Sequence, residues 1–355
     1  MSFAIRRVSP IEDRQELLDL LQRNLGASQE RRFEWRHTRN PAGSSWSWFV
    51  YDQNHPAPVA MASVFPRRMW VDGKAVLGGQ VGDFVVDPSH RSLGPALRLQ
   101  RATFEPVYSN ALAFCYDCPP HSQGMATFVR LGMQPSDKVV RYALLLRSEQ
   151  FLEKRLGRGL WIKPVARAAD LWLQMRIPNH RVPGLEICTY ERAFGEEFTW
   201  LDKRLSTLNL IRASRSAQDL NWRYREDPLM HAQNGRTGGY RVLVAQRGGE
   251  LLAFTVFFVQ SDGVASIVDL FGDRLAEVGI ALLEAVIEVC RRQDLLAVHG
   301  FCSDGSELNR LFIRAGFRPR ETAACVVAHE KAKDASARFL PPTLRWAFTQ
   351  MEIMI

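Results

Sequence analysis

The sequence predicts an α/β (α+β) protein made of two units with the same order of helices and strands, joined by a basic connector. Three segments recur in the same order at nearly constant spacing. WRHTRNP (35–41) is repeated as WRYREDP (222–228), and FVRLGMQP (128–135) is repeated as FIRAGFRP (312–319). Between them in the sequence, VGDFVVDP (81–88) corresponds to IVDLFGDR (267–274). This period is too long for a solenoid, so each copy should be a domain. We expect domains at 1–146 and 183–355, with a connector at 147–182.

Patterning predicts the same order of elements in both halves. In the first half, Ser9 and Pro10 should cap a helix that ends at Gly26, and a short helix should close before Pro41. Three strand-like runs follow, then a helix, a strand, a helix and a final strand, VVRYALLL. The second half repeats this order. The tryptophan of the repeated Trp-Arg element is expected to be a core anchor and not a ligand.

Bulk properties narrow the class of protein. The chain has 355 residues, of which 46% are hydrophobic, which is enough for two packed cores. It contains no apolar run of about 18 residues and begins without a signal-peptide pattern. Cys115 and Cys118 form a single CxxC pair with no second pair, which disfavours a zinc site. We expect a cytoplasmic, reduced protein without a bound metal or an integral membrane span.

Positive charge is concentrated in the connector. The formal net charge is +8, and residues 147–181 hold eight Lys/Arg against three Asp/Glu. Such a balance suits an anionic partner: a phosphate-rich cofactor, a nucleic acid or a lipid surface. Trp161 and Trp172 are expected to pack between the two domains. The alternative is that this basic, amphipathic segment makes peripheral contact with a membrane.

The segment GDFVVDPSHRSLGPALRL carries the strongest functional signal. A strand runs into Asp87 and Pro88, and a glycine-containing turn then opens a helix, whose N-terminal N–H groups suit a pyrophosphate. The segment resembles the acetyl-CoA pyrophosphate loop of the GNAT acyltransferase superfamily. The resemblance covers nearly all of residues 1–146 and implies a mixed, mostly antiparallel twisted sheet flanked by helices. It implies cofactor contacts from Arg91, Ser92, Leu93, Gly94, Pro95 and Ala96, although Pro95 lacks the usual N–H.

The resemblance also implies an N-acyltransferase site. The strand that ends at Val86 would splay from its neighbour, so that Phe84, Val85 and Val86 contact the acyl-CoA. Asp83 is a candidate general base or anchor for the amine, with a structural carboxylate as the alternative. Phe128, also placed against the cofactor, stands where the superfamily usually has a tyrosine acid. Tyr116 or His121 could replace that acid.

The second copy lacks the cofactor loop. Ala276 replaces Arg91, and Glu277 would face a pyrophosphate with like charge, while Gly279 persists. We expect a degenerate copy that builds part of the substrate cleft.

We therefore expect direct transfer from acetyl-CoA, or another acyl-CoA, to a small amine or an amino-sugar or envelope precursor, with no nucleic-acid partner. The alternatives are a Fem-type aminoacyl transferase and a non-catalytic binding protein.

Overall fold

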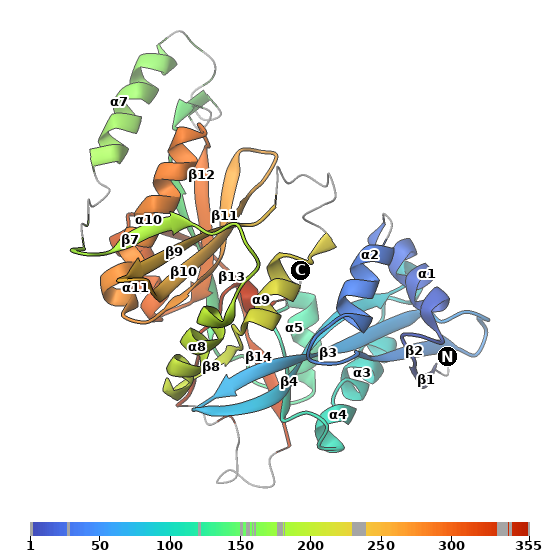
Figure 1. The fold of residues 1–355 in the computed structure, drawn as a ribbon. Helices are drawn as coiled ribbons and strands as arrows, with labels where there is room; N and C mark the ends of the chain where they lie inside the picture. Colours follow the sequence, from blue (N-terminus) through green and yellow to red (C-terminus); the bar gives the residue numbers. More distant parts are fainter. Residues whose placement is uncertain are drawn as a thin grey trace.

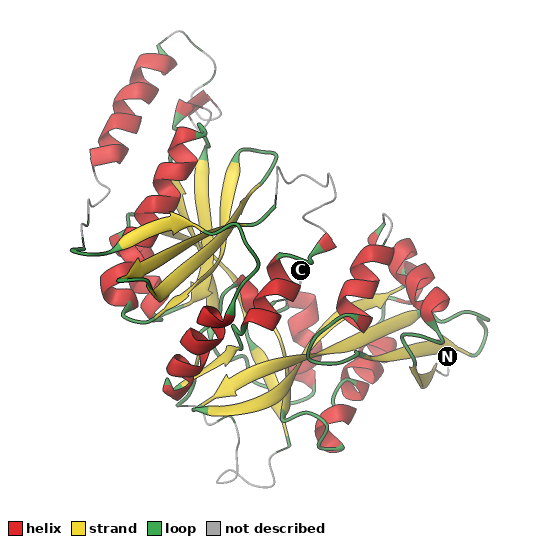
Figure 2. Cartoon of the chain, in the orientation of Figure 1, coloured by secondary structure: helices red, strands yellow, loops and turns green. Residues whose placement is uncertain are grey.

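The computed structural model describes residues 3–26, 29–119, 122–149, 152–153, 157, 159, 161–175, 180, 182–228, 239–331, 340 and 343–353. Two twisted sheets with helices packed on them form the frame of the molecule (Figures 1 and 2). Most strand pairs are antiparallel, and the pairs β4–β5, β11–β12 and β8–β15 are parallel. The predicted fold class is confirmed.

The first half follows the predicted order and adds a first strand and a short helix. Its elements are β1 (Phe3–Val8), α1 (Arg14–Leu25), α2 (Glu30–Phe33), the π-helix η1 (Glu34–Thr38), β2 (Trp46–Asp52), β3 (Ala60–Val71), β4 (Lys74–Val86), the 3₁₀ turn η2 (Pro88–His90), α3 (Leu93–Ala102), α4 (Glu105–Tyr108), β5 (Phe114–Asp117), α5 (Ser122–Arg130) and β6 (Lys138–Leu145).

The first helix starts later than predicted. Ser9 Oγ accepts long hydrogen bonds, of 3.3 Å, from the backbone N–H groups of Ile11 and Glu12, and so closes a turn before the helix begins at Arg14. The helix ends as predicted at Gly26, which adopts a φ of 66°.

The second half supplies the remaining elements. They are α7 (Ile162–Met175), β7 (Glu186–Thr189), α8 (Glu196–Arg204), η3 (Leu205–Thr207), β8 (Leu210–Ala213), α9 (Ala217–Tyr224), β9 (Arg241–Arg247), β10 (Glu250–Val259), β11 (Val264–Gly272), α10 (Leu275–Arg292), β12 (Ala297–Ser303), α11 (Glu307–Arg314), β13 (Arg318–Cys325), β14 (Val327–Glu330), β15 (Arg345–Trp346) and η6 (Gln350–Glu352).

The two sheets exchange strands. The first sheet has the order β1-β2-β3-β4-β5-β14, with β8 paired to β3 and β15 to β8, and the second has the order β13-β6-β12-β11-β10-β9-β7. Strand β6, expected to close the first unit, therefore lies in the second sheet, and β14 returns to the first. The crossing segments bind each other, since the N–H of Ser136 donates to the carbonyl of Val326 (2.8 Å) and that of Val326 donates to the carbonyl of Asp137 (2.9 Å).

The repeated Trp-Arg element lies where the two halves meet. The indole N–H of Trp35 donates to the carbonyl of Trp222 (2.9 Å), and that of Trp222 donates to the carbonyl of Trp35 (3.1 Å). The two rings stack with centroids 4.9 Å apart, and both are buried. The reciprocal bonds relate the two copies by a local pseudo-two-fold axis, and they confirm the tryptophan as a core anchor.

Separate cores fill the two faces of the first sheet. Residues of α1 and α2, such as Leu17 and Phe33, pack on one face, while Leu99 of α3 and Phe128 of α5 pack on the other. Helices α10 and α11 cover the second sheet. A further cluster contains residues of both sheets, for example Phe114 and Phe254, so the sheets share one core.

The connector differs from its prediction. Trp161, expected to be buried between the domains, is 51% exposed, and α7 extends from the body of the molecule at the top of Figure 1. Ile162 and Ala166 turn their side chains inward, while Trp161, Val165 and Leu171 stay exposed. The side chain of Trp172 lies outside the described part. No helix among the described residues combines the length and apolar character needed to cross a bilayer.

Candidate active site

The site begins where β4 and β5 separate. Their parallel pairing ends at Gln80 and Tyr116, whereas β4 continues to Val86. On its other side, β4 has a bulge against β3, because Met61 faces Val85 but Ser63 faces Gly82. Asp83 lies in this bulge with a φ of 46°, a left-handed conformation that asparagine and aspartate tolerate better than most residues. The predicted splay is present, and the bulge turns the Asp83 side chain toward η1.

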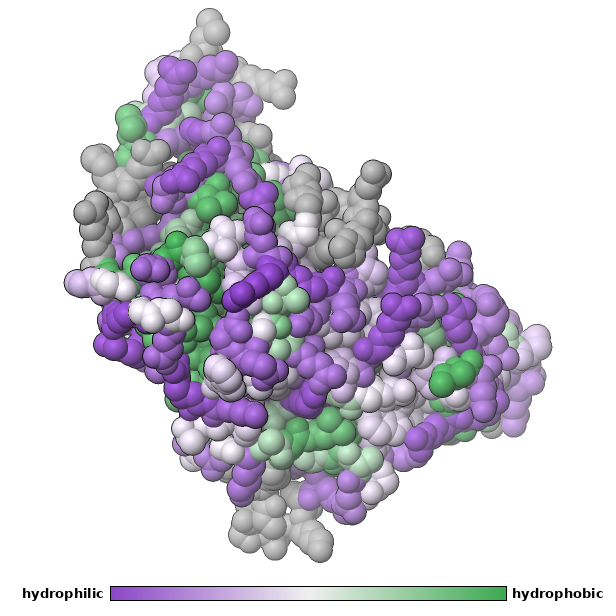
Figure 3. All heavy atoms as spheres, in the orientation of Figure 1, coloured by the Kyte–Doolittle hydropathy of each residue, from purple (hydrophilic) through white to green (hydrophobic). Residues whose placement is uncertain are grey.

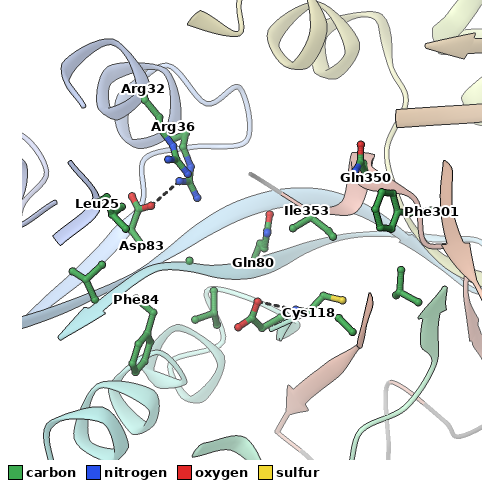
Figure 4. A pocket seen from close by; sticks show the side chains of 16 residues that line it. Leu25, Arg32, Arg36, Gln80, Asp83, Phe84, Cys118, Phe301, Gln350 and Ile353 are labelled. Atoms are coloured by element: carbon green, nitrogen blue, oxygen red, sulfur yellow. Dashed lines mark hydrogen bonds and ion pairs between the residues drawn. The ribbon is translucent and has the colours of Figure 1, made fainter. Parts of the chain in front are cut away.

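A cavity of about 490 Å³ opens beside this bulge. Figure 4 shows the side chains that surround it. Arg32 and Arg36 form one end with Asp83, and Asp117 and Cys118 line it where β5 ends. The second sheet and the C-terminal segment form the other end through Val139, Phe301, Ala324, Gln350 and Ile353. Both halves of the chain therefore build one cavity.

Asp83 is held by two side chains of the repeated element. Its Oδ1 lies 2.6 Å from Nη1 of Arg36, and its Oδ2 lies 2.9 Å from Nε2 of His37. Burial alone would raise the pKa of Asp83, but Arg36 and then His37 outweigh it and hold the pKa well below the usual range. Burial also lowers the pKa of His37, so its ring is neutral near pH 7. Asp83 is thus an ionised, anchored carboxylate at the cavity wall.

Asp117 has a different environment. It ends β5, lines the cavity, and accepts a 2.7 Å hydrogen bond from the N–H of Cys118. No Lys, Arg or His of the described residues forms an ion pair with it. Burial raises the pKa of Asp117 to about 7, although the Cys118 N–H opposes this. A carboxyl group with this pKa can take up and release a proton near neutral pH. Asp117 was not among the residues predicted from the sequence.

Two other predicted site residues do not line the cavity. Tyr116 is 1% exposed, and its hydroxyl donates to the carbonyl of Glu352 at 2.8 Å. Burial raises the pKa of Tyr116 far above neutrality. Phe128 is buried in the core beneath α3 and α5 and does not line the cavity. His121 lies outside the described residues.

The predicted cofactor loop follows β4 directly. Arg91, Ser92 and Gly94 are exposed at the start of α3, and no side chain caps this helix end. Arg91 Nε donates to the carbonyl of Val86 (3.3 Å). Pro95 is buried, Ala96 and Val86 are half-buried, and Phe84 and Val85 line the cavity. For Leu93, only the backbone is described.

Asp87 fixes this loop to α1. Its carboxylate accepts hydrogen bonds from Arg23 Nη2 (2.8 Å) and from the side-chain amide of Asn24 (2.7 Å). The exposed first turn of α3, with its free N–H groups and Arg91, fits a phosphate-bearing ligand.

The matching place in the second copy is filled by the protein itself. Pairing of β11 with β12 ends at Ile267 and Gly300, so the splay persists there. Asp269 lies beyond it with no exposed surface, paired to Arg215 (2.9 Å) and hydrogen-bonded to Thr349 of the C-terminal segment (3.3 Å).

The first turn of α10 also lacks an open anion site. The Glu277 carboxylate pairs there with Arg247 at 2.7 Å. A Cβ at Gly279 would lie 2.8 Å from Leu311 Cδ1, so the missing side chain lets α10 pack closely against α11.

Comparisons of sequence identify no relative: no family model and no curated protein matches the chain. Comparisons of structure do. A GCN5-related N-acetyltransferase from Anabaena variabilis matches with a TM-score of 0.63 at 12% identity, over 92% of this chain and 72% of that one. N-myristoyltransferase from Saccharomyces cerevisiae, solved with bound myristoyl-CoA, matches with a TM-score of 0.56 at 14% identity, over 92% and 82%.

A third matching structure is a tandem protein, as this chain is expected to be. A tandem GNAT protein from the clavulanic acid biosynthesis pathway aligns over 94% of this chain and all (100%) of its own, with a TM-score of 0.53 at 15% identity. Together with the two splayed sheets, these likenesses show that the chain has the tandem GNAT fold.

Proposed function

We propose that this protein is a cytoplasmic N-acyltransferase that transfers an acyl group, most simply acetyl, from acyl-CoA to a small amine. The observation that carries the proposal is the continuity of three features in the first copy. Along β4 and α3, the chain places three features next to one another: a cavity with a carboxyl group, a splayed strand with a bulge, and an uncapped helix end with Arg91. The second copy keeps the splay but has filled its site. The six cysteines are all free thiols, which fits a reducing compartment.

The chain's residues can perform the transfer as follows. The first turn of α3 and Arg91 would hold the pyrophosphate of the acyl-CoA, and its thioester would reach the cavity through the splay beside Phe84 and Val85. An amine bound in the cavity attacks the thioester carbon, so that a C–N bond forms and the C–S bond breaks. Asp117 takes the proton that the amine nitrogen loses, and the thiolate sulfur can receive it back.

Asp83 supports this reaction by position and not by proton transfer. Its carboxylate stays ionised and paired with Arg36, so it holds the cavity wall and the bulge in place. The geometry therefore favours Asp117 over Asp83 as the base. Tyr116 donates its hydroxyl proton elsewhere, and a thiolate can leave without an enzyme acid.

Calorimetry with acetyl-CoA and with a long-chain acyl-CoA tests the proposal directly. We expect micromolar binding at one site per chain, and release of CoA thiol when a panel of amines is added. Absence of binding to either thioester would contradict the proposal and favour a Fem-type or non-catalytic role.

A further inference from the structure

The charged end of the cavity has unused hydrogen-bond donors. Arg36 is 1% exposed and pairs with Asp83 through Nη1, but its Nε is buried without a partner. The Nε of Arg32 is also buried without a partner. Among the described residues, no carboxylate lies within ion-pair distance of Arg32. Both guanidinium groups line the same cavity, as Figure 4 shows.

This end therefore carries surplus positive charge. Two guanidinium groups face one ionised carboxylate, and the partner of that carboxylate on its other side, His37, is a neutral ring. Burial lowers the pKa of Arg36 to about 10, so Arg36 remains charged at neutral pH. Cations that are removed from water without an anion destabilise a protein. A carboxylate on a ligand would supply the missing anion and fit the planar donors of arginine.

The opposite end of the cavity is chemically different. Phe301, Ala324 and Ile353 present apolar surface there, and all three come from the second half of the chain. Gln350 adds a side-chain oxygen that is buried without a partner. Asp117 lines the same cavity. A ligand that fills the cavity would thus meet hydrogen-bond donors, a proton acceptor and an apolar wall.

We propose that the acceptor amine also carries a carboxylate, as an amino acid or short peptide does, and that Arg32 and Arg36 bind this carboxylate. The inference rests on the proposed function and names its substrate class. With the carboxylate at the arginines, the amine nitrogen would lie near Asp117, and an apolar side chain would contact Phe301 and Ala324. A neutral amino sugar would leave the surplus charge unpaired.

The test uses a matched pair of probes of the same size that differ only in the terminal group, a charged carboxylate or a neutral amide. Calorimetry on the whole protein would compare 3-phenylpropanoate with 3-phenylpropanamide. We expect the carboxylate to bind at least about tenfold more tightly than the amide, in line with a charge-assisted bidentate contact. Equal binding of the two probes, or binding of neither, would overturn the inference.

Variants locate the effect. Arg32→Gln should remove the preference for the carboxylate, and Arg32→Lys should keep part of it because the charge remains. Arg31→Gln makes the same charge change on an adjacent, exposed side chain and should keep the full preference. A loss of equal size in Arg31→Gln would show a general field effect and not a site. Thermal unfolding of each variant checks that the fold is intact.

Acetyl-CoA binding separates this inference from the proposed function. If the protein binds acetyl-CoA normally but binds 3-phenylpropanoate no more tightly than 3-phenylpropanamide, only the proposed substrate class is wrong. If acetyl-CoA does not bind while 3-phenylpropanoate does, the transferase proposal fails and the anion site stands.

Discussion

The proposed transfer of a proton from the amine depends on one side chain, Asp117. Asp117→Asn should lower kcat by roughly 10²–10⁴-fold, because the amide cannot accept the proton of the amine. The affinity for acetyl-CoA should not change. Since the active form is deprotonated and the pKa is about 7, kcat/KM of the wild type should rise with pH up to that value and then level off. The variant should lack this rise. Asp304→Asn, a change at an exposed aspartate, is the control.

Asp83 should behave as a structural charge. Asp83→Asn leaves the buried Arg36 guanidinium without its carboxylate, and breaking such a pair typically costs about 3–5 kcal/mol of unfolding free energy. Because the folded-state pKa of Asp83 is depressed, this stabilisation is present above the ordinary aspartate pKa of about 4 and is lost only as the pH falls further. The loss of stability in the variant should therefore be full at pH 7.

Denaturant unfolding at pH 7 and below pH 4 measures the effect of Asp83→Asn. Glu288→Gln, in an exposed pair with Arg292, is the matched control and should change stability little. A variant of Asp83 that keeps its stability but loses turnover would instead make Asp83 the base.

Asp83 and Asp117 illustrate what a sequence can reveal at the scale of residues. A carboxylate inside an apolar strand is conspicuous, so the pattern alone predicts a role for Asp83, but only the fold shows that Arg36 pairs with it and that His37 hydrogen-bonds to it. Asp117 directly follows the strand residue Tyr116, where polar residues are common, and it therefore gave little signal. Its position at the carboxyl end of a parallel strand beside the splay was the available clue.

At the scale of elements, the two helix starts after β4 and β11 make a matched pair. Arg91→Glu should weaken acetyl-CoA binding at least about tenfold, because it places a carboxylate beside the pyrophosphate. Ala276→Glu puts the same side chain on the exposed first turn of α10 and should leave binding unchanged. Calorimetry compares the two. Equal losses would mean that CoA contacts both copies.

Local patterns predicted most elements but not all their ends. Hydrophobic periodicity located the strands β2 to β6 and the long helix α10, because burial sets that periodicity. The start of α1 was wrong, since Ser9 and Pro10 also suit a turn. Four of the six residues of strand β1 are exposed and only Val8 is buried, so this strand has no apolar pattern in the sequence.

At the scale of the molecule, the exchange of β6 and β14 makes the two sheets depend on each other. Residues 1–146 produced alone would leave β6 without its sheet and β5 without β14. We expect this fragment to be unfolded or aggregated, and to fold when it is produced together with residues 147–355. Proton–nitrogen NMR spectra and co-purification test this. Cooperative melting of the isolated fragment would contradict it.

The sequence could not have predicted this exchange. Apolar patterning in VVRYALLL specifies a buried strand, but the pattern is the same whichever sheet receives it. The repeats predicted two copies, and the structure adds that the copies share a core, a cavity and a tryptophan pair.

The last prediction concerns α7 and Trp161, which directly precedes it and whose exposure reverses the expected packing. Trp161, Val165 and Leu171 are exposed apolar residues, the basic residues Lys163 and Arg167 are exposed between them in the sequence, and the top of Figure 3 shows hydrophobic residues among hydrophilic ones. An anionic membrane surface complements both features. We expect the protein to co-sediment with liposomes that contain anionic lipid, and less so as salt is raised. Trp161→Ala should weaken this binding, whereas Trp200→Ala, at a tryptophan on α8 that is 68% exposed, should not. If binding does not depend on the salt concentration, or if it falls equally in both variants, α7 is not a membrane contact.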